Sequence, residues 1–223
     1  MIEKILINMF NDLPYLSVIP FFDVSCFCYY LSSKAKLNKK SKKYLLPDFT
    51  KYNEEEKFSD VYIGYNELGI NLFFNVESTF VNVNYPDFRK GDSVEVFIDT
   101  RDIKNKGFIT RFCHHFVFFP KKIGDIYGKE ITRFRGDDMH NICDPNDLTI
   151  NSKINGDSYL MDIFIPRECL HGYDPQRYSK FGFIYRINRA EKSPQHFSLL
   201  SEEYLIEQNS ALWATIEMKK RKN

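Results

Sequence analysis

The chain has 223 residues and a mass of 26.5 kDa, which is enough for one large domain or two small ones. Hydrophobic residues make up 43% and charged residues 27% of the sequence, an ordinary globular composition that excludes a wholly disordered chain. The 31 basic and 30 acidic residues give a formal net charge of +1, which argues against a globally basic nucleic-acid binder.

The neutral sum hides two basic clusters. The loop at residues 34–43 carries six lysines and no acid: Lys34, Lys36, Lys39, Lys40, Lys42 and Lys43. The C-terminal tail at residues 219–223 adds four more bases. Without these ten bases the chain has 21 bases against 30 acids, a formal charge of −9. The lysine run is therefore either a solvated loop or a local surface for an acidic macromolecule.

Five cysteines are too few, and odd in number, for a disulfide scaffold. Met1–Phe10 lacks the pattern of a secretory signal, and the apolar stretch Leu16–Leu31 is too short for a membrane span and is interrupted by a proline and an aspartate. These features predict a soluble cytoplasmic protein with reduced cysteines. Cys26 and Cys28 share one face of any strand, which indicates buried structural thiols.

Alternating apolar residues bounded by turn residues predict a series of short strands. The expected strands, in chain order, are residues 11–18, 60–65, 70–76, 93–99, 111–119 (ended by Pro120), 159–165, 181–187 and 212–218. The only helical signal is one turn at Arg167–Leu170. The pattern predicts an all-β fold, a single antiparallel β-sandwich of jelly-roll or immunoglobulin-like type spanning residues 1–223, with long loops and few short helices.

The strands at 93–99 and 111–119 carry the richest set of polar residues. Alternation puts Glu95 and Asp99 on one face, and Arg111 and His115 face them if the two strands pair. Arg101 follows the first strand. Guanidinium donors and carboxylate acceptors on one face predict a site for a polar ligand, although a salt-bridged strand end is an equal alternative. Four tyrosines are candidate exposed stacking platforms: Tyr65, Tyr85, Tyr173 and Tyr185.

Two groups of residues have metal-ligand chemistry. Soft or borderline ligands for zinc are Cys113, His114, His115, His140 and Cys143. The adjacent His114 and His115 point to opposite faces of a strand, so at most one of them joins a shared site. Oxygen ligands for calcium lie in an acidic loop, at Asp137, Asp138, Asp144 and Asp147, without an EF-hand pattern. For both groups we favour a structural loop without a cofactor. A calcium site is the weaker alternative.

Enzyme motifs are missing from the sequence. There is no Gly-x-Ser-x-Gly elbow, no P-loop, and no Gly-x-Gly-x-x-Gly after a strand, and no carboxylate pair stands out. The one enzyme hypothesis that remains centres on the region of His114 and His115.

Several blocks of sequence resemble a known family. Residues 91–102 are similar to the central strand of family 9 carbohydrate-binding modules and of the wider DOMON-like β-sandwich superfamily, and residues 61–76 are similar to the preceding hairpin there. Residues 111–120, 172–175 and 212–217 resemble blocks of a bacterial branch of that superfamily. Together the blocks cover roughly residues 58–218.

The resemblance implies a non-catalytic sandwich that binds a sugar on an aromatic-lined face, often with structural calcium. By the resemblance, Arg111 would contact the sugar, flanked by Asp99 and Arg101. The sugar-binding modules hold their ligand between tryptophans, whereas the only tryptophan here is Trp213, which we expect to be buried in the last strand. DOMON-like relatives include haem binders with methionine and histidine ligands, and Met161 and His115 would be such a pair.

Three hypotheses follow. The first is a carbohydrate-binding-module-like protein that holds a saccharide on one sheet face. The second is a macromolecular interaction protein that uses the lysine-rich loop. The third is an enzyme that acts through the His114/His115 region.

Overall fold

The computed structural model describes residues 24–220. The strand expected at residues 11–18 and the last three residues of the basic tail lie outside the described residues. The described chain contains these strands: β1 Ser25–Tyr30, β2 Ser59–Asn66, β3 Gly69–Val76, β4 Ser93–Asp99, β5 Cys113–Ile123, β6 Ile126–Glu130, β7 Thr149–Ile154, β8 Tyr159–Pro166, β9 Lys180–Arg189, β10 Lys192–His196 and β11 Ala214–Lys219. Its short helices are η2 Lys42–Tyr44, η3 Phe88–Lys90, η4 Pro145–Asp147, η5 Arg167–Cys169, α2 Ser201–Tyr204 and η6 Ser210–Leu212.

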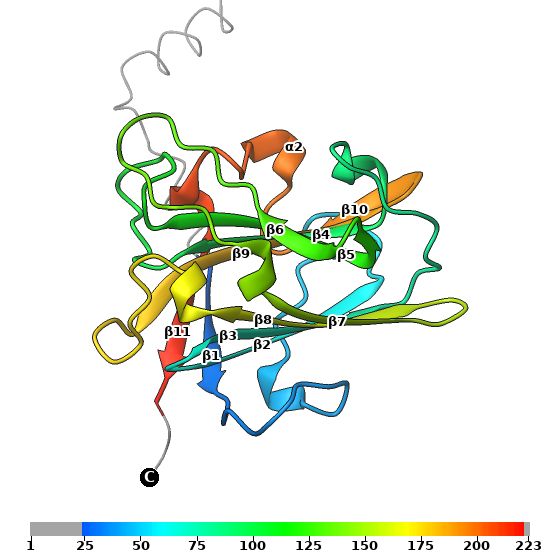
Figure 1. The fold of residues 1–223 in the computed structure, drawn as a ribbon, viewed down its shortest axis with the longest axis horizontal. Helices are drawn as coiled ribbons and strands as arrows, with labels where there is room; N and C mark the ends of the chain where they lie inside the picture. Colours follow the sequence, from blue (N-terminus) through cyan, green and yellow to red (C-terminus); the bar gives the residue numbers. More distant parts are fainter. Residues whose placement is uncertain (1–23, 221–223) are drawn as a thin grey trace, which may run out of the picture.

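All the strands belong to one sheet, in the order β6-β5-β4-β9-β11-β1-β2-β3-β8-β7, with β10 beside β9. The sheet folds over on itself, so that β4, β5, β6 and β9 lie above β2, β3, β7 and β8 (Figure 1). Where the two layers meet at the open edge, β5 contacts β7 and β8. The predicted all-β class is confirmed, but the separate antiparallel sheets of a sandwich are replaced by one continuous, nearly closed sheet.

The sheet is also not purely antiparallel. β1 pairs in parallel with both β11 and β2, while every other pairing is antiparallel. A parallel pair needs a long connection, which β1 has on both sides because β11 is the last strand and residues 31–58 precede β2. The sequence pattern of a single strand carries no record of such distant pairing.

Phenylalanine fills the space between the layers. Val94, Val96 and Ile98 of β4 are fully buried on the inner face, as the alternation predicts. Fully buried rings pack around them: Phe74, Phe116, Phe118, Phe183 and Phe197. The high aromatic content of the sequence is therefore mostly core, where each ring contributes a large apolar area.

The hairpin β2–β3 confirms the predicted turn. Asn66 pairs with Gly69, and Gly69 has a φ of +150°, a conformation that side chains disfavour. A Cβ at Gly69 would lie 2.2 Å from the carbonyl oxygen of Ile165 on β8. Glycine is required here because β8 lies directly against the turn.

Four strands have no clear signal in the sequence. They are β1, β6, β7 and β10. β7 is an exposed edge strand with few apolar residues, and β10 contains Pro194 and an irregular register. Pro120 does not end its strand: β5 continues to Ile123 across a register shift. β6, β7 and β10 are short or irregular edge strands, which lack the alternation on which prediction depends, whereas β1 is an interior strand.

One disulfide corrects the expectation of reduced cysteines. Cys143 and Cys169 are joined, whereas Cys26, Cys28 and Cys113 are free and buried. Burial raises the pKa of Cys26 to about 12 and that of Cys113 to about 11, so these thiols are unreactive, as expected for structural cysteines. Within residues 24–220, no helix has the length and apolar character needed to cross a bilayer.

Candidate functional site

A cleft of about 500 Å³ opens on the outer face of the β4–β5 pair. Residues 86–90, 131–135 and 207–208 contribute to its lining. The sheet contributes Phe97, His115 and Trp213. A cavity of this size, with aromatic rings and a few polar groups, is typical of a small-ligand site.

A buried carboxylate lies beside the cleft. Glu95 of β4 faces Arg186 of β9 across the sheet, because the two residues are paired in register. One carboxylate oxygen, Oε1, accepts hydrogen bonds from Arg186 Nε at 2.7 Å and from Asn188 Nδ2 at 2.9 Å. The other, Oε2, contacts His115 Nε2 at 2.9 Å and Arg89 Nη2 at 3.3 Å. We call Glu95 and these four partners the Glu95 cluster.

The Glu95 cluster keeps its carboxylate ionised. Burial opposes ionisation, but the hydrogen bond and charge attraction of His115, together with Arg89 and Asn188, outweigh it and lower the pKa of Glu95. Arg89 also reaches Glu207, with Nη1 at 3.2 Å from Oε1, and its side chain is 41% exposed. Arg89 therefore presents the cluster to solvent at the cleft.

Hydrogen bonds continue from Arg186 away from the cleft. Arg186 Nη1 donates to Ser201 Oγ at 2.5 Å, His196 Nε2 lies 2.8 Å from that oxygen, and Glu55 Oε1 lies 2.6 Å from His196 Nδ1. The order of serine, histidine and carboxylate resembles a catalytic triad. However, Ser201 is only 3% exposed and its oxygen already accepts from Arg186. The arrangement therefore anchors Arg186.

Aromatic rings support the sheet side of the cleft. The His115 ring stacks on Phe97 with 4.0 Å between ring centroids, and Phe97 lies 5.7 Å from Trp213. Trp213 is 1% exposed and donates from Nε1 to the Ile206 carbonyl at 2.7 Å. The predicted burial of the only tryptophan is confirmed, so it supports the cleft without presenting a free ring face.

The structure brings together only part of the predicted polar face. Glu95 and His115 meet, but Asp99 ends β4 and accepts from the backbone nitrogens of Arg101 and Ile103 in the following turn at 3.0 and 2.7 Å. Arg101 lies on the Tyr178 ring, 3.5 Å from its centroid. Arg111 forms an ion pair with Asp138. Asp99, Arg101 and Arg111 are therefore outside the Glu95 cluster and do not line the cleft.

The tyrosines need a correction. Tyr65 is 4% exposed and donates its hydroxyl to the Lys219 carbonyl, and burial raises its pKa to about 12. Tyr173 and Tyr185 are buried as well. Tyr85 alone is exposed, at 45%, with its ring against Phe119. Three of the four are unavailable for stacking because the rest of the chain covers their rings.

The sequence reasoning missed Arg89, Arg186 and Asn188. Arg186 and Asn188 alternate within the otherwise apolar strand β9, and both are buried. A charged residue in the middle of an apolar strand indicates a buried partner, since an unpaired charge there is costly. Arg89 lies in η3, where the sequence offers no such signal.

The structure brings together a different set of metal-ligand residues from the one predicted. His114 lies with His140, as the zinc pattern allows, but the third member is Glu130. Cys143 is in the disulfide, and Cys113 contacts Thr110. His114, Glu130 and His140 are the one group of metal-ligand side chains found within the described residues, so the four aspartates proposed for calcium do not converge there.

Those aspartates have other partners or stand alone. Asp138 pairs with Arg111, and Asp144 caps η4 by accepting from the backbone nitrogen of Asn146 at 2.9 Å. The suggested haem pair is separated as well. Met161 is buried in β8, whereas His115 lies on the outer face of β5 and borders the cleft.

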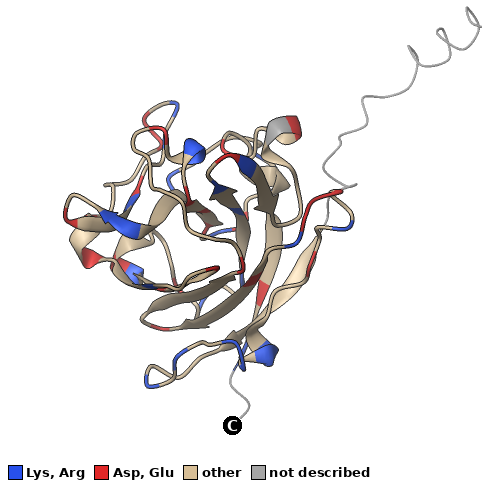
Figure 2. Cartoon of the chain, turned by 90° about the vertical axis from the view of Figure 1, so that its right-hand side faces the viewer, with Lys and Arg blue, Asp and Glu red and all other residues tan. Residues whose placement is uncertain are grey.

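The lysine-rich loop lies away from the cleft. It covers the outer face of β2 and β3, where Leu31 and Leu37 pack on Tyr62 and Phe73. Its six lysines are exposed, and the blue segments at the bottom of the view in Figure 2 include this loop. The loop therefore does not cap the candidate site.

Comparisons with known proteins give matches only among solved structures. No family model and no curated protein matches the chain. A family 9 carbohydrate-binding module from Caldicellulosiruptor kristjanssonii in complex with cellotriose has a TM-score of 0.63 and 14% identity, over 89% of this chain and 95% of that one. The module in complex with glucose has a TM-score of 0.62 and 13% identity, over 89% and 97%. At this identity the likeness shows a shared fold, which agrees with the carbohydrate-binding-module part of the resemblance.

Proposed function

We propose that this chain is a non-catalytic carbohydrate-binding protein whose saccharide site is the cleft beside the Glu95 cluster. The observation that carries the proposal is an open cleft of about 500 Å³ that borders buried, ionised polar groups, in a fold shared with modules solved with glucose and cellotriose. Saccharide recognition needs hydroxyl partners held in fixed positions, and the cluster supplies them.

The polar groups suit sugar hydroxyls. Arg89 and Gln208 provide exposed donors, and Glu207 provides an acceptor across the same opening. Phe88 and Phe134, both half-buried, line the walls and offer apolar surface to a sugar ring. Without a pair of facing tryptophans, we expect modest affinity.

The test is isothermal titration calorimetry of the full chain with glucose, cellotriose and a panel of other mono- and oligosaccharides. We expect dissociation constants on the order of 1 mM or tighter for one sugar class. Arg89→Gln should weaken that binding by about 10-fold, the effect of losing one charged hydrogen bond. Arg111→Gln is the matched control because Arg111 does not line the cleft.

Two results would overturn the proposal. The first is no heat and no competition from any sugar in the panel. The second is loss of binding in Arg111→Gln with unchanged binding in Arg89→Gln, which would move the site to the strand end favoured by the family resemblance.

The lysine-rich loop supports a second, separate proposal. Its six exposed lysines form no ion pair with an acidic side chain within the described residues, and Lys43 lies over the Tyr29 ring at 4.5 Å. We propose that an acidic macromolecule binds there. Binding of a polyanion such as heparin should then fall steeply with salt and disappear when Lys39, Lys40, Lys42 and Lys43 become Gln. Unchanged binding in that variant would remove this role.

A further inference from the structure

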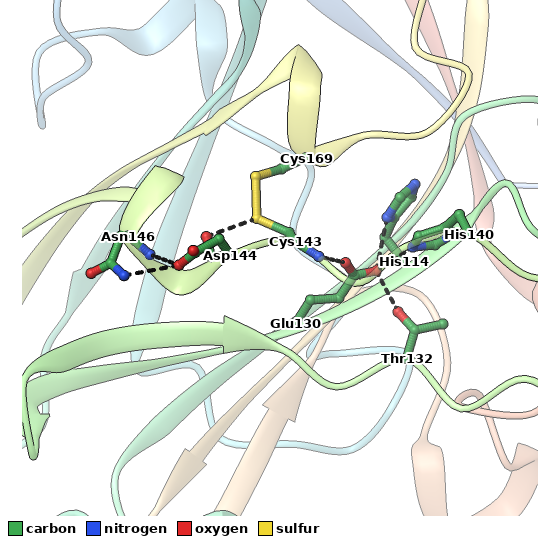
Figure 3. The surroundings of a disulfide bond; sticks show 8 residues. All are labelled: His114, Glu130, Thr132, His140, Cys143, Asp144, Asn146 and Cys169. Carbon is green, nitrogen blue, oxygen red and sulfur yellow. Dashed lines mark hydrogen bonds and ion pairs between the residues drawn. A yellow bond between two sulfur atoms is a disulfide. The ribbon is translucent and has the colours of Figure 1, made fainter.

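Two histidines and a glutamate converge on the inner side of β5. His114 Nδ1 lies 2.9 Å from Glu130 Oε1, and His140 Nε2 lies 2.8 Å from the same oxygen (Figure 3). The side chains of His114 and Glu130 are fully buried, and that of His140 is 2% exposed. The ligand atoms of the three residues all lie within 4.8 Å of one another. We call these residues the His114 cluster.

Glu130 Oε1 has more hydrogen-bonding neighbours than its lone pairs can accept. Thr132 Oγ1 also lies 2.6 Å from Glu130 Oε1, so three polar atoms converge on a single oxygen with two lone pairs. The other oxygen, Oε2, accepts from the backbone nitrogen of Cys143 at 2.8 Å. His114 Nε2 is buried and makes no hydrogen bond of normal geometry within the described residues, although the His171 backbone also acts on this ring. A network made of protons alone leaves this cluster crowded at Glu130 Oε1.

His140 is oriented as a metal ligand would be. Its Nδ1 lies 2.7 Å from the carbonyl oxygen of Arg111. A carbonyl oxygen only accepts, so Nδ1 carries a hydrogen and Nε2 is the nitrogen that faces Glu130. Histidines that bind metals typically donate their second ring N–H to a carbonyl or carboxylate in this way, which fixes the tautomer and the ring.

The carboxylate is held in position as well. Its Oε2 accepts from the Cys143 backbone, and the disulfide Cys143–Cys169 fixes the segment that carries this donor. Thr132 Oγ1, which lies against Oε1, accepts a hydrogen bond from the backbone nitrogen of His115 at 2.8 Å. Both outer partners of Glu130 are therefore fixed by other contacts.

We propose that His114, Glu130 and His140 form a binding site for a divalent transition-metal ion of the zinc class. Two imidazole nitrogens and one carboxylate are a known ligand set for zinc, and they leave one coordination position for water or an anion. On binding, the ion replaces the protons between the rings and Glu130 Oε1. His114 and Thr132 are among the residues that line the cleft, whereas the ligand atoms themselves are buried.

The Glu95 cluster shows why this assignment is specific. It has an equally buried carboxylate, but its partners include two guanidinium groups, which carry no free lone pair for a metal. His115 is then the only histidine near Glu95. The His114 cluster and the proposed saccharide site are therefore separable by mutation.

The test measures zinc binding by the full chain. Protein stripped with EDTA is titrated with ZnCl₂ against a chromophoric chelator, and metal content is measured by mass spectrometry after dialysis. We expect one Zn²⁺ per chain. His114→Asn and His140→Asn should each lower the affinity by at least about 100-fold, and Thr132→Val by about 10-fold, since losing an outer partner costs 10- to 100-fold.

His115→Asn and His171→Asn are the controls and should bind Zn²⁺ as the unmodified chain does. His115 is on the same strand facing the cleft, and the His171 ring lies 5.8 Å from the His140 ring without belonging to the cluster. Circular dichroism and the metal-free melting temperature show whether each variant folds. The more peripheral His140→Asn keeps the test decisive if His114→Asn does not fold.

Visible absorption of the Co²⁺-loaded chain gives a second readout, because ligand-field bands report the coordinating atoms directly. Absence of stoichiometric Zn²⁺ binding would overturn the proposal. Binding that survives unchanged in His114→Asn and His140→Asn, or that is lost equally in His171→Asn, would overturn it too.

Discussion

His114 and His115 are neighbours on β5, yet they belong to two different kinds of buried site. His115 faces outward to Glu95, which also binds Arg89 and Arg186. His114 faces inward to Glu130, whose other imidazole partner is His140. Both carboxylates are fully buried and both contact histidine nitrogen at 2.9 Å. The difference lies in the remaining partners.

Those partners determine when each carboxylate is neutralised. Guanidinium groups stay charged at every pH at which proteins fold, so Glu95 has permanent counter-charges. A neutral imidazole keeps a free lone pair on one ring nitrogen, so the partners of Glu130 are also ligands for a metal ion. The Glu95 cluster is therefore a fixed support beside the cleft. The His114 cluster is conditional, because its partners depend on whether a metal ion is bound.

Glu95→Gln should have the largest effect. It leaves the buried Arg186 without its carboxylate, and breaking a buried pair from one side costs about 3–5 kcal/mol of the free energy of unfolding. Urea denaturation measures the loss. Glu217→Gln is the control, because Glu217 forms a half-exposed pair with Lys219 and should change stability by less than about 1 kcal/mol. Equal effects of the two substitutions would contradict the importance of the Glu95 cluster.

Removing the disulfide should come next. Cys143 and Cys169 are separated by 26 residues, and closing a loop of that length stabilises by about 3 kcal/mol. The double variant Cys143→Ser/Cys169→Ser should lose this amount in denaturation under oxidising conditions. Its stability should not change further on addition of dithiothreitol, whereas that of the unmodified chain should fall. A reducing agent without effect on the unmodified chain would show that the bond is not formed in solution.

Local alternation predicted the Glu95–His115 contact, because it depends on two adjacent strands with strong patterns. The same reasoning did not find Glu130, which ends the short strand β6. His140 was a candidate ligand by residue type and spacing, but its position beside Glu130 was not predicted, because His140 lies outside any strand. The disulfide was also out of reach, since five cysteines do not reveal which two meet.

Local alternation also predicted only part of the fold. Strands with strong alternation, such as β4 and β9, were expected at nearly their observed bounds. The continuous sheet was not, because β1 joins the two layers through parallel pairing with β11 and β2. Tyr65 shows the same limit: alternation assigns it a face, but not that the rest of the chain covers that face.

Acid should destabilise the protein through the His114 cluster. The pKa of Glu130 is lowered from its ordinary value of 4.5 to about 2, so the folded state binds fewer protons than the unfolded state between these values. The stability that Glu130 provides is complete above pH 4.5 and is lost as the pH falls towards 2, with a slope of at most about 1.4 kcal/mol per pH unit from this group. Glu130→Gln should flatten that part of the stability profile, measured by denaturation from pH 6 to pH 2. An unchanged profile would contradict the ionised state of Glu130.

The smallest effect should come from comparing His114→Asn with His115→Asn in the absence of metal. His114 has a fully buried side chain, and its loss removes a hydrogen bond to Glu130, so we expect a cost of about 2 kcal/mol. The His115 side chain is 13% exposed, and Glu95 keeps its arginines and Asn188 without it, so we expect about 1 kcal/mol or less. The same two variants should also differ in their pH dependence. Burial lowers the pKa of His114, so this side chain stays neutral in the folded protein at pH values where it takes up a proton in the unfolded chain. The unmodified chain should therefore lose stability as the pH falls below 6.5, and His114→Asn should lose less stability over that interval than His115→Asn. The reverse order, in cost or in pH dependence, would mean that the fixed support lies at the His114 cluster and the conditional site beside the cleft.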